Sequence, residues 1–399
     1  MFDLIRSGSI TSASGFLAGA VHAGMKGKDE LDLAILCSEV TCRSAGVFTT
    51  NRIKSAPVIL SQRHISEGRA QAIVANSGCA NACVGKQGLA DALEMAKLTA
   101  EKLGISPVEV LVASTGVIGV SLPMDKIKAA IPKIEPTNEG GHNFCRAIMT
   151  TDTNPKEIAV RVDSKEDRFT IGGVAKGAGM IHANMATLLC FIATDAMVTG
   201  DFLSAALHKA VDCSFNMVSI DGDTSPSDCT FLLANGLAGN EPVDFSNSEA
   251  FQEALNAVCT HLARAIARDG EGATKLIEVT VERAEDEVEA RQAARAIVSS
   301  SLVKAAIHGN DPNWGRVVAA LGRSGARVKQ DKLDVYLNKV CVMKQGSPSI
   351  FNKADMISTL GNTDKVLVEL YLNLGDGKAT AWGCDLSEEY VTINSAYTT

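Results

Sequence analysis

The chain has 399 residues, of which 46% are hydrophobic and 21% are charged. This composition is typical of a globular protein of one large domain or two, and it excludes an intrinsically disordered chain. The formal net charge is −8, there is no basic block, and only 5% of the residues are aromatic, so a nucleic-acid partner is not expected.

The start of the chain and its cysteines indicate the compartment. Residues 1–6 lack the basic start and the long apolar region of a signal peptide. No apolar run reaches the roughly 18 residues that a membrane span requires. The 11 cysteines are scattered, form no CxxC pair and have no histidine pair nearby. We therefore expect a cytoplasmic protein with free thiols, no membrane contact and no metal site.

The first part of the chain reads as short strands and one clear helix. Residues 87–103 carry apolar side chains at helical spacing and are followed by Gly104, which favours a helix with a glycine at its end. Two short strands around a turn are expected at residues 33–36 and 45–48. Further strands are predicted at residues 71–75 and at 108–113, the last of which leads into Ser114-Thr115-Gly116.

The later part also alternates helices and strands. A helix follows Thr199-Gly200-Asp201, and Ser246 to Glu249 reads as a capping box that opens a helix ending near Arg268. Residues 277–282 alternate apolar and polar side chains, as a half-exposed strand does. A hairpin is expected from residues 366–374 and 378–386. Together these elements predict an α+β fold with sheets packed between helices.

The segment from Lys176 to Thr187 is the most informative, because a glycine turn leads to Ala186, Thr187 and then the apolar run 188–193. A threonine hydroxyl is a poor nucleophile without an adjacent base. If the peptide bond before Thr187 breaks, the new α-amine, with a pKa of about 7.7–8.0, can accept the proton of the hydroxyl. The order therefore suits a self-cleaving threonine nucleophile. An ordinary loop that enters a core strand is the alternative.

Other polar segments allow two interpretations each. Ser114-Thr115-Gly116 suits an oxyanion site or a simple turn at the end of a strand. Lys176 suits a substrate carboxylate or a solvated position, and the glycines after it match neither the Walker A nor the GxGxxG order. The acidic loop from Asp221 to Asp228 lacks the spacing of a calcium loop. His182 as a base and Arg316 as a carboxylate ligand are further candidates.

Motifs in a fixed order run through nearly the whole chain. They include Phe48-Thr49-Thr50-Asn51-Arg52, Ser114-Thr115-Gly116-Val117-Ile118-Gly119, Met149-Thr150-Thr151-Asp152-Thr153, Asn184-Met185-Ala186-Thr187, Asp221-Gly222-Asp223-Thr224-Ser225, Arg268-Asp269-Gly270-Glu271-Gly272 and Ile393-Asn394-Ser395. In these motifs and their order the chain resembles the ornithine acetyltransferase family, the bifunctional glutamate N-acetyltransferases of cyclic arginine biosynthesis.

The resemblance implies a layered αββα fold and a precursor that cuts itself between Ala186 and Thr187. The products would be an α chain, residues 1–186, and a β chain, residues 187–399, assembled as a heterotetramer of two of each. Thr187 would take the acetyl group of N2-acetylornithine and pass it to glutamate through an acetyl-threonine intermediate. No cofactor is implied, although acetyl-CoA would be a second acetyl donor in a bifunctional enzyme.

The resemblance also assigns roles to residues. Thr115 and Gly116 correspond to the oxyanion pair of the family. The substrate-binding positions of the family correspond to Thr151, Lys176, Thr187, Glu271, Asn394 and Thr399. Among these, Lys176 suits a carboxylate and Glu271 suits an amine.

The chain departs from the family pattern close to the expected cut. Ala178, Ala183 and Leu188 stand where serine, proline and methionine are usual, so the loop has more conformational freedom and self-cleavage is expected to be slower. Two other functions are compatible with the residues. One is a self-processing aminopeptidase or amidohydrolase that uses the same threonine, and the other is a binding protein that is never cleaved.

Overall fold

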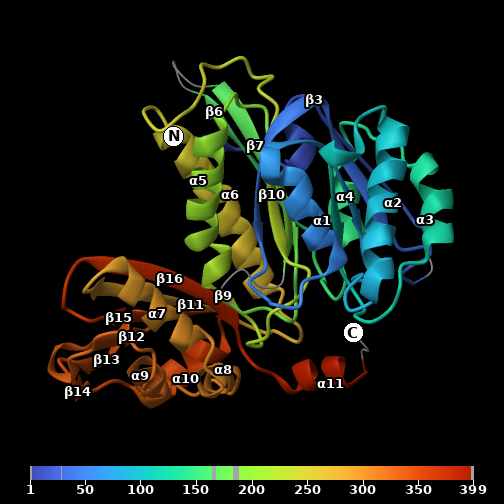
Figure 1. Cartoon of the computed structure of the whole chain (residues 1–399). Coiled ribbons are helices and arrows are strands. Elements are labelled where there is room, and N and C mark those ends of the chain that lie inside the picture. The colour runs from blue at the N-terminus through green and yellow to red at the C-terminus, as the bar shows by residue number, and fades with distance from the viewer. Residues whose placement is uncertain (1, 28, 164–167, 183–187, 397–399) are drawn as a thin grey trace.

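The computed structural model describes residues 2–27, 29–163, 168–182 and 188–396. Within these residues it has two β-sheets and eleven α-helices (Figure 1), which confirms the α+β class. The helices are α1 (Ala56–His64), α2 (Gly85–Leu103), α3 (Met124–Ala130), α4 (Gly141–Ile148), α5 (Gly200–Asp212), α6 (Glu249–Arg268), α7 (Glu287–Val298), α8 (Ser301–His308), α9 (Trp314–Gly322), α10 (Lys353–Gly361) and α11 (Glu388–Ala396).

The larger sheet has nine strands in the order β1-β6-β7-β8-β10-β3-β4-β5, with β2 paired to β3. Two of its central strands, β8 and β10, follow residue 187 in the sequence, whereas their outer neighbours β7 and β3 precede it. The strands are β1 (Phe2–Leu4), β2 (Phe16–Val21), β3 (Leu33–Phe48), β4 (Arg69–Asn76), β5 (Val110–Ser114), β6 (Lys156–Asp163), β7 (Arg168–Lys176), β8 (Leu189–Thr194) and β10 (Cys229–Ala234).

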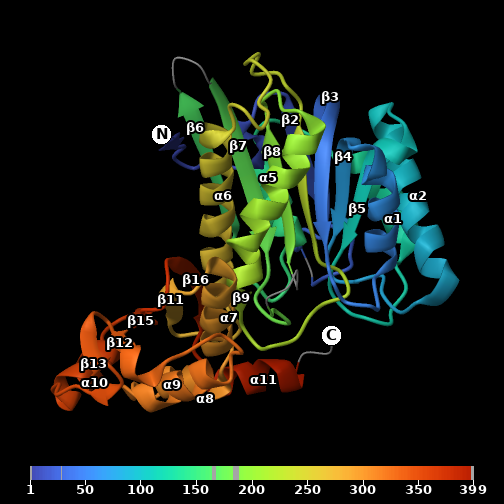
Figure 2. The same ribbon diagram turned by 60° about the vertical axis from the view of Figure 1, so that its left-hand side comes forward.

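Both faces of the larger sheet are covered, which explains why β8 is apolar along its whole length. All six residues of β8 are buried. Phe191 packs edge-to-face on Phe144 of α4 with ring centroids 5.5 Å apart, whereas Ile192 belongs to the core beneath α5 and α6 on the opposite face. Figure 2 shows α5 and α6 across one part of this face and α1 and α2 beside β4 and β5. The strand predicted after residue 187 is therefore confirmed.

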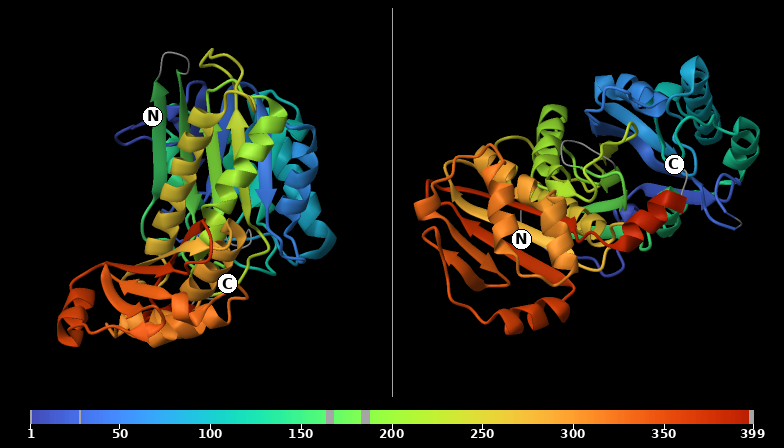
Figure 3. Two further views of the ribbon diagram at one scale, coloured as in Figure 1. Left: turned by 90° about the vertical axis from the view of Figure 1, so that its left-hand side faces the viewer. Right: turned by 90° about the horizontal axis from the view of Figure 1, so that it is seen from below.

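The smaller sheet forms a lobe beside the larger one (Figure 3), and α6 links the two because it contacts β6 and β7 as well as β9 and β16. Helix α7 packs on β11 and β16 of this sheet. The strand order of the smaller sheet is β14-β13-β12-β15-β11-β16-β9. The strands are β9 (Val218–Ser219), β11 (Leu276–Ala284), β12 (Asp334–Leu337), β13 (Val340–Lys344), β14 (Ser347–Pro348), β15 (Lys365–Tyr371) and β16 (Gly377–Cys384).

The expected hairpin near the end of the chain is wrong. Strands β15 and β16 are not neighbours, because β11 lies between them and pairs with both, parallel to β15 and antiparallel to β16. The connection after β15 must then cross the end of β11. Glycine is required at this crossing, since a Cβ on Gly375 would lie 2.5 Å from the carbonyl oxygen of Glu285.

Two further predictions are corrected. The two short strands expected at residues 33–36 and 45–48 are one strand, β3, whose register with β4 shifts between Cys37 and Cys42. The expected capping box of α6 does not form, because the N-cap is Ser248 and its side chain makes no capping hydrogen bond. None of the helices in the described ranges is long and apolar enough to cross a membrane.

Candidate active site

A pocket of about 80 Å³ lies where the larger sheet meets the loop after α6 and the helix α11. Six residues singled out from the sequence line it, although they come from five separate segments of the chain. They are Thr115, Gly116, Thr151, Lys176, Glu271 and Asn394. The fold therefore gathers most of the expected site into one place.

Thr115 and Gly116 follow directly after β5, where the backbone of Gly78 and Cys79 approaches closely. Gly116 has φ +127°, and a Cβ there would lie 2.6 Å from the amide nitrogen of Cys79, so only glycine fits. The N–H of Thr115 donates to Asn76. No described residue accepts a hydrogen bond from the N–H of Gly116, which leaves this amide available to a bound ligand.

Lys176 ends β7 and is only 6% exposed. Its ammonium group donates to Thr150 Oγ1 over 2.7 Å and to Thr115 Oγ1 over 3.3 Å. Since the hydroxyl oxygen of Thr115 accepts this bond, its own proton is free to point into the pocket. Burial lowers the pKa of Lys176, against the attraction of Asp152, Asp228 and Glu271.

Behind the pocket lies a buried ion network of Asp152, Lys156 and Asp269, which we call the loop clamp. The ammonium group of Lys156 lies 2.6 Å from a carboxylate oxygen of each aspartate. Asp152 also accepts the N–H of Gly177 over 2.7 Å. Although burial alone would raise the pKa of Asp152, the neighbouring Lys176 and Lys156 lower it to about 2. The loop clamp thus fixes three pocket loops relative to one another.

Glu271 and Asn394 form the acidic side of the pocket. The side-chain amide of Asn394 donates to Glu271 Oε2 over 2.8 Å, so α11 is held against the loop after α6. The backbone of the same loop is fixed because Glu271 N–H donates to the carbonyl of Ala178 over 2.8 Å. Gly179 lies directly beside the Glu271 carboxylate, where a Cβ would overlap it.

The expected nucleophile Thr187, its neighbour Ala186 and the expected ligand Thr399 lie outside the described residues. The described residues on both sides of the expected cut lie close to the pocket. Met180 lines it, and its N–H and that of Ile181 donate to the carboxylate of Asp221. On the other side, the carbonyl of Leu188 accepts the N–H of Cys229, two residues after the pocket residue Ser227.

Arg316, His182 and Asp221, which were also considered as site candidates in the sequence, do not line the pocket. The guanidinium of Arg316 donates to the carbonyl of Leu302 and is not part of the pocket. His182 is within hydrogen-bonding distance of Ser219 Oγ, and burial lowers its pKa. Asp221 holds backbone amides, as a turn residue would. Within the described ranges no group of three or more histidine, cysteine or acidic side chains is arranged to hold a metal ion.

Sequence reasoning missed several residues of the site. Thr150, Ser225 and Ser227 line the pocket, and the loop clamp lies behind it. Thr150 and Asp152 belong to the motif at residues 149–153, from which only Thr151 was predicted as a site residue. The role of Lys156 could not be predicted from the sequence, because nothing about a single lysine at the start of a strand indicates that it is buried between two aspartates.

Comparison with known proteins gives one consistent result. The model of the ArgJ family matches residues 17–399. The arginine biosynthesis bifunctional protein ArgJ of Dehalococcoides mccartyi is 53% identical to this chain, and the match covers 100% of this chain and 99% of that protein. The protein of the same name from Symbiobacterium thermophilum is 50% identical, and the match covers 98% of this chain and 99% of that protein. A crystal structure of the arginine biosynthesis bifunctional protein ArgJ from Bacillus halodurans is 42% identical to this chain with a TM-score of 0.50, and the match covers 51% of this chain and 96% of that one. The structure of a Mycobacterium tuberculosis ornithine acetyltransferase complexed with ornithine is 38% identical with a TM-score of 0.44, and the match covers 46% of this chain and 99% of that one.

Proposed function

The chain belongs to the ArgJ family and is an acetyltransferase of arginine biosynthesis, and from this premise we propose how it works. It cuts itself before Thr187 and then moves the acetyl group of N2-acetylornithine to glutamate through an acetyl-threonine intermediate. The observation that carries the proposal is the convergence of Thr115, Gly116, Lys176, Glu271 and Asn394 on one pocket.

In the first step the hydroxyl oxygen of Thr187 attacks the carbonyl carbon of Ala186. The C–N bond breaks, the amine of Thr187 takes the proton, and an ester joins the two residues. Water then hydrolyses the ester, which leaves a carboxylate on Ala186 and a free α-amine and hydroxyl on Thr187. The share of this chain that the Bacillus halodurans relative covers supports the cut, because 51% is close to what either product would span.

In the second step the α-amine of Thr187 takes the proton of its hydroxyl, and the oxygen attacks the acetyl carbon of N2-acetylornithine. The oxyanion that forms would accept hydrogen bonds from the N–H of Gly116 and the hydroxyl of Thr115, two residues that line the pocket. Ornithine leaves with the proton. The amine of glutamate then attacks the acetyl-threonine, which yields N-acetylglutamate and restores Thr187.

The charges of the pocket fit both amino acids. Lys176 is a buried cation that suits the α-carboxylate that ornithine and glutamate share. Glu271 suits an amine, and its contact with Asn394 holds it in place. Thr151 also lines the pocket, and Thr399 is proposed as a further ligand at the end of the β chain.

We further propose a cytoplasmic enzyme that assembles as two α and two β chains. The transfer itself needs no cofactor, since Thr187 carries the acetyl group. Acetyl-CoA is the second donor to test, because the relatives are called bifunctional. Its use would show as acetyl-CoA-dependent formation of N-acetylglutamate in the absence of acetylornithine.

Mass spectrometry of the intact purified protein tests the proposal. We expect two fragments that meet between Ala186 and Thr187, and one added acetyl group on the C-terminal fragment after brief exposure to acetylornithine. Added glutamate should remove that group as N-acetylglutamate. Release of acetate at the same rate with or without glutamate would instead identify a hydrolase.

Substitutions provide the control. Thr187→Ala should abolish both cleavage and transfer, whereas Thr187→Ser should retain cleavage because it keeps a hydroxyl. Thr359→Ala, on the exposed side of α10, should change neither. A Thr187→Ala protein that still splits at this bond would overturn the assignment of the nucleophile.

A further inference from the structure

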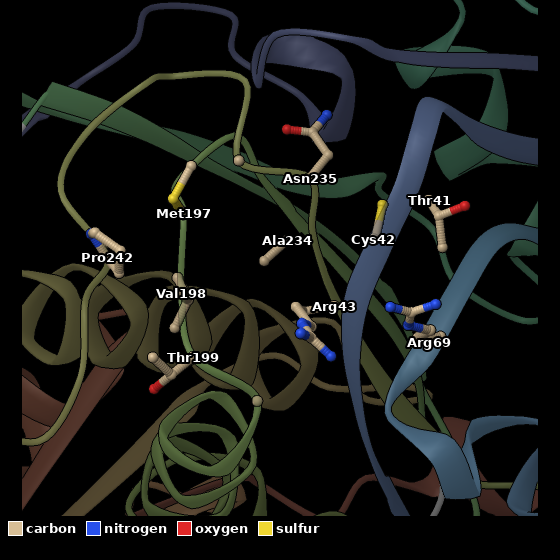
Figure 4. A pocket seen from close by; sticks show the side chains of 12 residues that line it. Thr41, Cys42, Arg43, Arg69, Met197, Val198, Thr199, Ala234, Asn235 and Pro242 are labelled. Atoms are coloured by element: carbon tan, nitrogen blue, oxygen red, sulfur yellow. The ribbon is translucent and has the colours of Figure 1, made fainter.

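A second pocket lies at the opposite end of the central strands. It has a volume of about 420 Å³ and opens between the ends of β8 and β10, the start of α5, and strands β3 and β4 (Figure 4). The catalytic pocket lies near the first residues of β8 and β10, which are six residues long. At about 3.3 Å per residue, roughly 20 Å separate the two pockets.

Two arginines of this pocket lie side by side on neighbouring strands. Arg43 of β3 and Arg69 of β4 are directly opposite in the antiparallel register, so both side chains emerge on the same face of the sheet. Their Cα atoms are therefore only about 4.5–5.5 Å apart. Like charges at directly opposite positions destabilise a sheet unless something compensates them.

The described residues do not provide this compensation. Among the residues that the structure describes, neither guanidinium group forms an ion pair or a side-chain hydrogen bond. This is unexpected in a chain with 46 acidic and 38 basic residues. Both side chains are exposed, so their charge is available to a ligand in the pocket.

The facing wall combines a polar and an apolar part. Thr199 is the N-cap of the 13-residue helix α5, but its hydroxyl caps no backbone amide of that helix, so it also is available to a ligand. Met197, 41% exposed, and Pro242 form an apolar surface next to it. Figure 4 shows these three residues across the pocket from the two arginines.

We propose that this pocket binds a small organic anion. Its phosphate or carboxylate group is held by Arg43 and Arg69, because the planar guanidinium group matches both anions with paired hydrogen bonds. Its apolar part lies against Met197 and Pro242. The volume of 420 Å³ falls within the range of small-molecule sites. The site is separate from the catalytic pocket and does not depend on the proposed reaction.

Isothermal titration calorimetry of the full chain in phosphate-free, low-salt buffer tests the proposal. Phenyl phosphate and benzoate serve as probes with the same apolar ring and different anionic groups, and the tighter of the two identifies the class of anion. Inorganic phosphate should bind more weakly than phenyl phosphate because it lacks the ring. Arg43→Gln and Arg69→Gln should each raise the Kd of the tighter probe by about tenfold or more.

Two control variants separate this site from others. Arg161→Gln removes an exposed arginine of β6 in the same sheet and should leave the Kd unchanged. Lys176→Met should also leave it unchanged, because that lysine belongs to the other pocket. The proposal is overturned if neither aromatic probe binds the unmodified protein, or if binding survives in both arginine variants. Thermal melting of each variant checks that it is folded.

Discussion

At the scale of single residues, the site depends on glycine where two backbones meet. Gly116 combines a positive φ with a close contact to Cys79, and its N–H is the donor that the oxyanion would need. A side chain at this position would push apart the two loops that form the wall of the pocket.

Gly116→Ala should therefore lower kcat by roughly 100-fold or more, because the donor moves away from the oxyanion. Gly119→Ala is the matched control. Gly119 also has a positive φ, +81°, but a Cβ there would meet nothing within 4 Å. It should cost only about 1 kcal/mol of backbone strain and little activity. Equal losses of activity in the two variants would contradict the role of Gly116.

Asp152 makes stability depend on acid pH. Its pKa is about 2 in the folded protein, below its usual value of 3.8. Its contribution is therefore fully present above about pH 4 and is lost as the pH falls from 4 to 2. We expect about 2 kcal/mol from this residue. The free energy of unfolding of Asp152→Asn, measured by urea titration, should fall less steeply over this interval than that of the unmodified protein.

At the scale of elements, the loop clamp connects the start of β6, the loop after β7 and the end of α6. Each of these segments lies next to a pocket residue in the sequence: Thr151, Gly179 and Glu271. The arrangement explains how a site built from loops is kept rigid, since a buried charge with two partners has few alternative positions.

Lys156→Met should therefore destabilise the fold by about 3–5 kcal/mol, because it leaves two aspartates buried without their cation. It should also raise the KM for acetylornithine, since the pocket loops lose their common anchor. The matched control is Lys128→Met, which removes an exposed lysine paired with Glu94 over 3.0 Å and should change stability little. Similar denaturation midpoints for the two variants would argue against the clamp.

The elements also show what sequence can and cannot predict. Local patterns correctly predicted α2 from helical spacing, β8 from a continuous apolar run and β11 from alternation, because each of these patterns lies within one segment. They failed for β15 and β16, since nothing local reveals that β11, some 80 residues earlier, lies between them. The candidate site came from motifs. The clamp around Lys156 was missed because nothing local shows that this lysine is buried, or that Asp269, far along the chain, joins the nearby Asp152 as its partner.

At the scale of the whole molecule, the two expected chains are interleaved. Strands β8 and β10 of the later part lie between β7 and β3 of the earlier part, with hydrogen-bonded ladders on both sides. The peptide bond before Thr187 is therefore not what holds the two parts together.

After cleavage the fragments should remain one particle. Size-exclusion chromatography in native buffer should give a single peak, whereas a denaturing gel of that peak shows two bands, each about half the mass of the chain. The uncleaved Thr187→Ala protein should elute at the same volume. Fragments that separate without denaturant would contradict the interleaved sheet.

The interleaving also bears on synthesis from a split gene. Residues 1–186 made alone would lack the two strands that join β7 to β3, and two strand edges would face water. Residues 187–399 made alone would expose β8 and β10, whose twelve residues are all buried in the intact sheet. Each half should therefore aggregate when translated by itself, and only co-translation of both within one cell should yield soluble enzyme.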